Sequence, residues 1–114
     1  MTKRRLRLGA DGEALAAAWY EANGYEVLAR NWRCSEGEID LVLCRGRCVV
    51  ICEVKTRSTD AFGVPAEAVT YAKRAKLRVL ASRWLVQAPL RPKEIRFDVA
   101  AVLAGKLEII EAAF

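Results

Sequence analysis

Apolar residues along the chain follow two spacings, one typical of helices and one typical of strands. In segments 9–23 and 66–86 they recur every three or four positions, which predicts two helices. Five further segments are rich in β-branched residues or alternate apolar with polar side chains; these predicted strands are 25–32, 38–45, 48–56, 94–103 and 106–110. The order α-β-β-β-α-β-β predicts a mixed α/β fold in which helices flank a central sheet.

The two predicted helices differ in composition. The first is alanine-rich, and its expected buried stripe is Leu15, Trp19 and Ala22. The basic run 3–5 precedes it and is interpreted as a solvated tail. The second helix follows Pro65, a residue that is favoured in the first turn of a helix. Its predicted buried stripe is Val69, Leu77, Leu80 and Trp84.

Register in the hairpin of the second and third predicted strands brings three polar residues together. We take Gly46 and Arg47 as the two turn residues, with glycine at the first position. Counting back along both strands then places Asp40 directly opposite Glu53. Directly opposed residues share one face of a sheet, with their Cβ atoms about 4.5–5.5 Å apart. Lys55 lies two residues beyond Glu53, so we expect it on the same face.

Asp40 and Glu53 would repel each other at this separation unless positive charge lies between them. Mg²⁺ or Mn²⁺ would supply that charge, because such ions bind one or two carboxylates and keep water and phosphate oxygens as further ligands. A bound ion polarises a phosphoryl oxygen and lowers the pKa of its water, and a nearby lysine stabilises negative charge on the phosphorane. The other interpretation is a salt-bridge network on a solvated sheet face. The apolar run 49–54 predicts a buried strand, where unused charges are costly, but the residues alone leave both interpretations open.

Composition narrows the chemistry available to the chain. Its 114 residues are enough for one domain, 1–114, and too few for two. It contains no histidine, which excludes Ser-His-Asp and Cys-His catalysis, zinc sites with histidine ligands and proton transfer by imidazole. A formal net charge of +5 favours a polyanionic partner.

None of the four cysteines has the two-residue spacing of a zinc or redox motif. They are Cys34, Cys44, Cys48 and Cys52. Three lie in apolar strand-like runs, so we interpret them as reduced structural thiols rather than as disulfides or metal ligands. No segment approaches the ~20 apolar residues that cross a bilayer. We therefore expect a cytoplasmic protein without membrane association.

Several motifs, taken together, resemble a known family. Asp40, with Glu53-Val54-Lys55 a hairpin later and Glu13 on the preceding helix, is similar to the PD-(D/E)xK nuclease superfamily. The chain resembles the YraN-like family of small bacterial proteins more closely, over about residues 9–85. The matching stretches are Gly12-Glu13, Ala29-Arg30-Asn31-Trp32-Arg33, Gly37-Glu38-Ile39-Asp40-Leu41, Glu53-Val54-Lys55-Thr56-Arg57, Phe62-Gly63-Val64-Pro65, Glu67-Ala68-Val69 and Lys73.

This resemblance implies a restriction-endonuclease-like αβββαβ core and a metal-dependent endonuclease that hydrolyses phosphodiesters, in DNA rather than RNA. It implies that Asp40, Glu53 and Lys55 are the catalytic residues. It also implies that Glu13, Asp40 and Glu53 are ligands of Mg²⁺ or Mn²⁺. Without the resemblance, Glu13 would be interpreted as an acid in the first turn of a helix, where it complements the helix dipole. Glu38 shares the face of Asp40 and is either an accessory ligand or, as we favour, a salt-bridge partner.

The basic residues have two interpretations, as a solvated surface or as contacts for phosphate. Arg57 follows the Glu-x-Lys strand, and the second helix exposes Lys73, Arg74 and Arg78. We predict nucleic-acid binding by Arg57, Lys73 and Arg74. No base-reading motif is present, so we expect recognition of a DNA structure such as a branch, flap or end.

Three functional hypotheses follow from these features. The first is the metal-dependent endonuclease, the second is a non-catalytic nucleic-acid-binding module, and the third is a structural partner in a protein assembly. YraN-like proteins also distantly resemble archaeal Holliday-junction resolvases. Many resolvase-like nucleases dimerise to cut two strands, so this resemblance adds a homodimer to the expectations.

Overall fold

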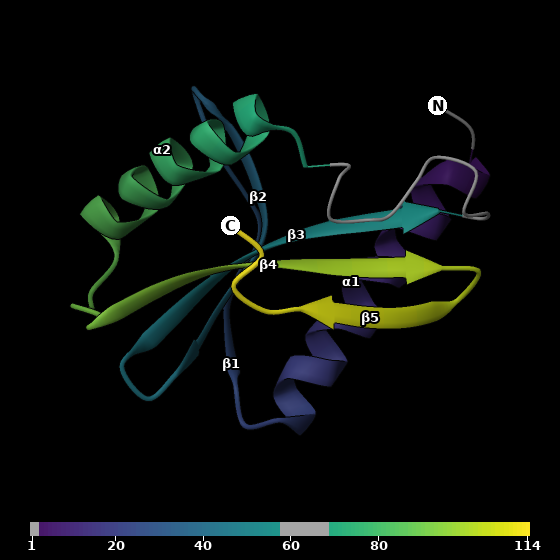
Figure 1. Cartoon of the computed structure of the whole chain (residues 1–114), viewed down its shortest axis with the longest axis horizontal. Helices are drawn as coiled ribbons and strands as arrows, with labels where there is room; N and C mark the ends of the chain where they lie inside the picture. Colours follow the sequence, from purple (N-terminus) through teal and green to yellow (C-terminus); the bar gives the residue numbers. More distant parts are fainter. Residues whose placement is uncertain (1–2, 58–68) are drawn as a thin grey trace.

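The computed structural model describes residues 3–57 and 69–114 and has the predicted order of elements (Figure 1). The helices and strands are α1 (Lys3–Ala22), β1 (Glu26–Cys34), β2 (Gly37–Arg45), β3 (Cys48–Arg57), α2 (Tyr71–Gln87), β4 (Glu94–Leu103) and β5 (Lys106–Ile110). All five predicted strands are confirmed, each within two residues of its predicted bounds.

The five strands form one mixed sheet in the order β1-β2-β3-β4-β5. Every neighbouring pair is antiparallel except β3 and β4, which are parallel and are connected through α2. The two helices cover opposite faces of the sheet, and each face has its own apolar core (Figure 1). This arrangement is the mixed α/β fold predicted from the sequence and is consistent with an αβββαβ core.

The β2–β3 hairpin has the predicted register. Arg45 pairs with Cys48, and Gly46 takes a positive φ of 60° in the turn between them. The paired residues end at Leu41 and Cys52, so Asp40 and Glu53 are the next positions in register beyond the last pair. At this point the two strands separate and leave space for side chains from other elements.

The first helix corrects two expectations. It begins at Lys3, so the basic run 3–5 is part of α1 and not a tail. Its buried face carries Ala16, Ala17 and Tyr20, whereas Leu15 is 41% exposed and Ala22 is exposed. The prediction was wrong at Leu15 and Ala22, because hydrophobicity alone ranks Leu15 above alanine, whereas the predicted Trp19 does pack, partly buried, against this core.

Small residues decide which side of α1 faces the sheet. Gly12 is buried against β3, and a Cβ atom there would lie 2.3 Å from Oγ1 of Thr56. Ala16 and Ala17 continue the same close contact at the core. A leucine at any of these three positions would hold this part of the helix away from β3, so close packing here favours small side chains, and the larger Tyr20 is buried one turn further along.

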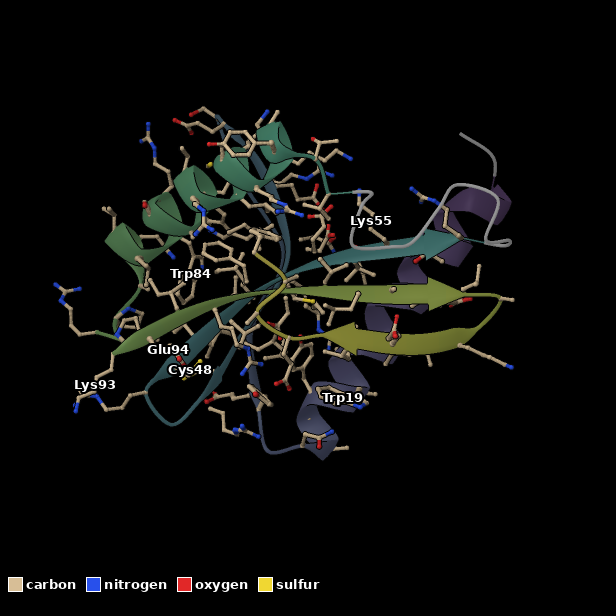
Figure 2. All side chains as sticks on the ribbon, viewed as in Figure 1. Trp19, Cys48, Lys55, Trp84, Lys93 and Glu94 are labelled. Atoms are coloured by element: carbon tan, nitrogen blue, oxygen red, sulfur yellow. The ribbon has the colours of Figure 1, made fainter. Side chains whose placement is uncertain are left out.

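The second helix begins at Tyr71 rather than at residue 66. Thr70 caps it, because its hydroxyl accepts a hydrogen bond of 3.3 Å from the Lys73 backbone N–H. Pro65 lies outside the described residues. The predicted buried residues Leu77, Leu80 and Trp84 are confirmed, and Trp84 points from α2 toward the sheet (Figure 2). Val69 is buried as predicted but lies just before the helix.

All four cysteines are free, as predicted. Within residues 3–57 and 69–114, no helix has both the length and the apolar character that would let it cross a membrane.

Candidate metal centre and adjoining groove

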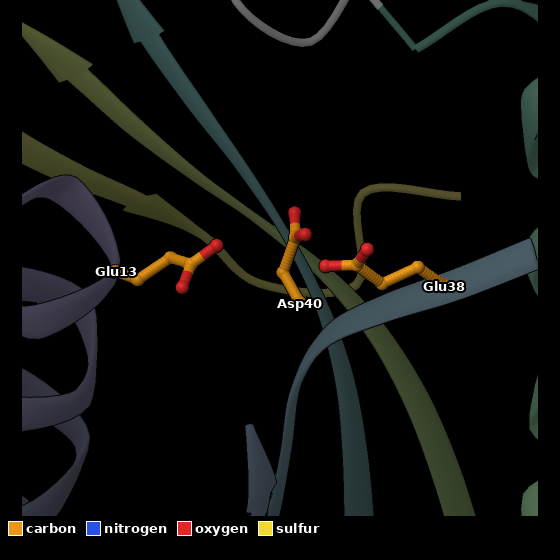
Figure 3. A group of neighbouring side chains, drawn as sticks. All are labelled: Glu13, Glu38 and Asp40. Carbon is orange, nitrogen blue, oxygen red and sulfur yellow. The ribbon is translucent and has the colours of Figure 1, made fainter. Parts of the chain in front are cut away.

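Three carboxylates meet where β2 separates from β3. Asp40 and Glu38 come from β2, and Glu13 comes from α1. One oxygen of each lies within 4.8 Å of the others. Figure 3 shows Asp40 between the other two, with Glu13 reaching it from the helix and Glu38 from the strand.

Glu13 reaches this cluster because it lies on the buried side of α1. It precedes Ala16, Ala17 and Tyr20 at helical spacing and is half-buried. Since α1 starts at Lys3, Glu13 is not in the first turn of the helix, and the dipole interpretation does not apply. Burial raises the pKa of Glu13, and the charges of neighbouring glutamates add to this, while a hydrogen bond with the Asn31 side chain opposes it.

Asp40 is the electrostatic centre of the cluster. Burial raises its pKa from 3.8 to about 7, and the negative charge of Glu53 is the next largest cause. Its Oδ2 accepts a hydrogen bond of 2.8 Å from the Val54 N–H, which works in the opposite direction. Glu13 and Glu38 add further repulsion. Burial and three neighbouring glutamates thus act together against the charged form of Asp40.

Glu53 and Lys55 form an ion pair on β3 beside the cluster. The distance from Lys55 Nζ to Glu53 Oε1 is 3.3 Å, and the two side chains are only 14% and 18% exposed. Lys55 lies in the half of β3 that leads to its C-terminal end (Figure 2). The predicted trio of Asp40, Glu53 and Lys55 thus lies in one neighbourhood.

The third carboxylate that converges with Glu13 and Asp40 is that of Glu38, and the predicted ligand Glu53 is not a member of this group. The sequence interpretation favoured Glu38 as a salt-bridge partner. Glu38 does form that salt bridge, at 2.9 Å to Nε of Arg33. It also belongs to the three-carboxylate cluster, so both of its predicted roles are compatible with its position. Its place two residues before Asp40 on one strand was the sequence signal for this proximity.

A groove of about 220 Å³ adjoins the cluster between β2 and α2. One side carries Glu38 and Glu53, and the other carries Lys73 and Lys76. The pKa of Lys73 is lowered, chiefly by its contact with Lys55. Two ammonium groups that repel each other in this way favour an anion between them.

The three predicted nucleic-acid-binding residues occupy different positions. Lys73 lies in the groove. Arg57 ends β3, is half-buried and donates from Nη1 to the Thr56 carbonyl at 3.0 Å. Arg74 lies outside the residues that line the groove, and its Nε donates to the Val69 carbonyl at 3.1 Å. Only Lys73 is therefore brought directly to the groove beside the acids.

The donor set fits a hard divalent cation. Glu13, Glu38 and Asp40 offer only oxygen atoms, which suits Mg²⁺ or Mn²⁺. Oxygens that bind one Mg²⁺ lie about 3–4 Å apart, so small side-chain movements would bring these three to that spacing.

Fold and site together define an α/β protein with an acidic cluster beside the central strand of a mixed sheet and lysines across the adjoining groove. The model of the family described as uncharacterised protein family UPF0102 matches residues 12–102, which include every residue of the cluster and of the Glu53–Lys55 pair. The chain belongs to the UPF0102 family, which confirms the YraN-like resemblance.

Relatives in this family match most of the chain. A UPF0102 protein of Beutenbergia cavernae is 55% identical over 96 residues, which is 84% of this chain and 81% of the relative. One of Mycolicibacterium vanbaalenii is 47% identical over 110 residues, covering 96% and 91%. One of Moorella thermoacetica is 46% identical over 121 residues and matches both chains over their full length.

Proposed function

We propose that this protein is a Mg²⁺- or Mn²⁺-dependent endonuclease that hydrolyses phosphodiester bonds in DNA. The observation that carries the proposal is the convergence of Glu13, Glu38 and Asp40 beside Lys55 and a lysine-lined groove. Carboxylates repel phosphate, so a site that only binds nucleic acid gains nothing from three of them. The similarity to PD-(D/E)xK nucleases assigns Glu13, Asp40, Glu53 and Lys55 to the metal site and to hydrolysis, and the geometry adds Glu38 to that set.

Each group has a place in this reaction. Glu13, Glu38 and Asp40 would hold the ion, which supplies Lewis-acid polarisation of the phosphate and a water of lowered pKa. Lys73 would bind a non-bridging oxygen of the phosphate in the groove. Lys55 would stabilise the charge that develops as the water oxygen bonds to phosphorus and the bond to the leaving oxygen breaks.

The remaining expectations belong to this proposal. The substrate is DNA rather than RNA, recognised by its structure as a branch, flap or end, since the chain has no base-reading motif. The protein works in the cytoplasm, and a homodimer would allow it to cut two strands.

The direct test offers branched, flapped, nicked and single-stranded DNA with Mg²⁺ or Mn²⁺. The test variants are Asp40→Asn and Lys55→Met, which keep the size of each side chain. Their matched controls are Glu108→Gln and Lys106→Met on β5, at positions that are exposed. We expect cleavage by the wild type and both controls, and a loss of at least about a hundredfold in each test variant.

Two results would contradict the proposal. Cleavage that persists in Asp40→Asn and Lys55→Met would exclude the assigned site. Salt-sensitive DNA binding without cleavage of any substrate would favour the alternative, a nucleic-acid-binding module that uses the lysines and arginines of α2 alone. Binding of Mn²⁺ by the wild type, followed by calorimetry and compared with Asp40→Asn, tests the metal centre independently of cleavage.

A further inference from the structure

A second hollow lies on the side of α2 away from the acidic groove. Its volume is about 270 Å³, and we name it the Tyr71 hollow. Its lining residues are Tyr71, Arg74, Ala75, Arg78 and Phe114. The combination is one exposed aromatic ring, two guanidinium groups and a further ring from the C-terminal segment, with no carboxylate side chain among them.

The two arginines are supported by aromatic rings. The guanidinium carbon of Arg78 lies 4.8 Å from the ring centre of Phe97, and that of Arg74 lies 5.3 Å from the ring centre of Phe114. The two phenylalanine rings stack on each other at 5.3 Å, so they form a firm base for both groups. Among residues 3–57 and 69–114, neither Arg74 nor Arg78 has a salt bridge to a carboxylate.

Such arginines are suited to an external anion. Their planar groups are positioned before any ligand arrives, which lowers the entropy cost of binding phosphate. A solvated basic helix face needs no aromatic support of this kind. The two guanidinium groups are therefore complementary in charge to the phosphates of a nucleic-acid chain.

Tyr71 supplies a surface of a different kind. It is the first residue of α2, directly after the Thr70 cap, and it is 87% exposed. A ring this exposed contributes little to the core. Proteins that bind single strands place aromatic rings beside cationic grooves, because a ring stacks on any unpaired base.

The hollow and the groove are close enough for one DNA strand to contact both. They flank the first turns of α2, where Lys73 lines the groove and the next residue, Arg74, lines the hollow. A helix with its side chains is about 10–12 Å across. That distance corresponds to about three stacked nucleotides at about 3.4 Å each.

We propose that the Tyr71 hollow binds an unpaired nucleotide of the substrate, with its base stacked on Tyr71 and neighbouring phosphates at Arg74 and Arg78. This inference rests on the proposed DNA substrate and specifies which part of it is read. The hollow would select DNA that carries a single-stranded segment next to the bond in the acidic groove.

The experiment measures DNA binding in EDTA, where metal-dependent cleavage does not occur. The probes are a blunt duplex, the same duplex with a single-stranded tail, and the tailed duplex with abasic sites in the tail. The abasic tail keeps the phosphates and lacks only the bases. The test variants are Tyr71→Ala, Tyr71→Phe and Arg78→Gln. The controls are Val86→Ala, at the exposed far end of the same helix, and Arg91→Gln, an exposed arginine beyond it.

We expect the wild type to bind the tailed duplex about tenfold more tightly than the blunt or the abasic one, as one stacked base provides. Tyr71→Ala should lose this preference, and Tyr71→Phe and both controls should keep it. Arg78→Gln should weaken binding to the normal and abasic tails equally, because it removes a phosphate contact.

Retention of the tail preference in Tyr71→Ala would overturn the inference, even if the protein proves to be a nuclease. A tail preference that depends on Tyr71 supports it, even if no substrate is cut. If the wild type binds none of these probes but binds a polyglutamate peptide through Arg78, the hollow is a protein-docking site, and both this inference and the DNA substrate are wrong.

Discussion

Replacing Asp40 by asparagine removes the central charge of the acidic cluster and keeps its shape. The amide oxygen can still accept the hydrogen bond from the Val54 N–H that Asp40 Oδ2 accepts at 2.8 Å. Asparagine carries no charge at any pH, so it removes the repulsion from Glu53, Glu13 and Glu38. The variant therefore separates what this charge does for stability from what it does for metal binding.

The size of the effect follows from the pKa of Asp40. Raising it from 3.8 in the unfolded chain to about 7 in the folded protein destabilises the metal-free fold by about 4 kcal/mol at a pH above both values. The folded state binds more protons than the unfolded state in this window. The stability that protonated Asp40 contributes at low pH is therefore lost as the pH rises from about 4 to about 8.

Asparagine does not titrate, so its variant does not lose stability as the pH rises. Its amide oxygen is uncharged, however, and accepts the hydrogen bond from the Val54 N–H as a neutral group. A hydrogen bond to a neutral oxygen is weaker than one to a carboxylate by about 1 kcal/mol. Relaxation of the neighbouring glutamates reduces the gain further. We expect Asp40→Asn to be more stable than the wild type by about 2–3 kcal/mol at pH 8.5, a rise in Tm of about 8–12 °C.

Thermal unfolding in EDTA, followed by circular dichroism from pH 4.5 to 8.5, measures this difference. The advantage of Asp40→Asn should shrink to less than about 1 kcal/mol at the acidic end. Mn²⁺ at 100 times its Kd should then stabilise the wild type by about 2.7 kcal/mol and leave the variant unchanged. Glu108→Gln on β5 is the control for loss of an exposed carboxylate.

An Asp40→Asn protein that is less stable than the wild type at pH 8.5 would refute this reasoning. So would a stability difference that does not change with pH. Either result would mean that the cluster is neutralised without a cation and functions as a salt-bridge network.

Three further predictions concern the packing of α1 against the sheet. Gly12→Ala should destabilise the protein by about 1–2 kcal/mol, because the new Cβ would lie 2.3 Å from Thr56 Oγ1. Chemical denaturation should show a smaller loss when Gly12→Ala is combined with Thr56→Ala, and purely additive effects of the two substitutions would exclude this contact as the cause. Tyr20→Phe should cost about 1–3 kcal/mol, since it removes the 2.6 Å hydrogen bond that Tyr20 donates to the fully buried Asp98; an unchanged urea midpoint would show that the bond contributes nothing. Cys52 should resist iodoacetamide at pH 8 until the protein unfolds, because burial raises its pKa to about 12. Modification of Cys52 itself in the native protein, located by peptide mass spectrometry, would contradict its burial.

Local sequence was sufficient for the strands and for the hairpin register. The Gly46 turn determines that Arg45 pairs with Cys48, and every pair up to Leu41 and Cys52 follows by counting. Asp40 and Glu53 could therefore be placed in one neighbourhood before any tertiary contact was known. These are properties of adjacent strands, which short-range signals determine.

The buried face of α1 and the first residue of α2 needed more than local pattern. Hydrophobicity favoured Leu15 as the buried residue of α1, but close contact with β3 at Gly12 selects the alanine face instead. The Thr70 cap starts α2 later than its apolar spacing suggests. In both cases a specific contact outweighed the general preference of the residue type.

The candidate metal centre was likewise determined partly by the sequence and partly by the tertiary structure. The sequence by itself determined that Asp40, Glu53 and Lys55 are neighbours and that the chain must do its chemistry without histidine. Only the tertiary structure decided that Glu38 converges with Asp40 and Glu13, because this depends on where β2 leaves β3 and where α1 crosses the sheet. The raised pKa of Asp40 is likewise a product of burial by several elements, which no single segment encodes.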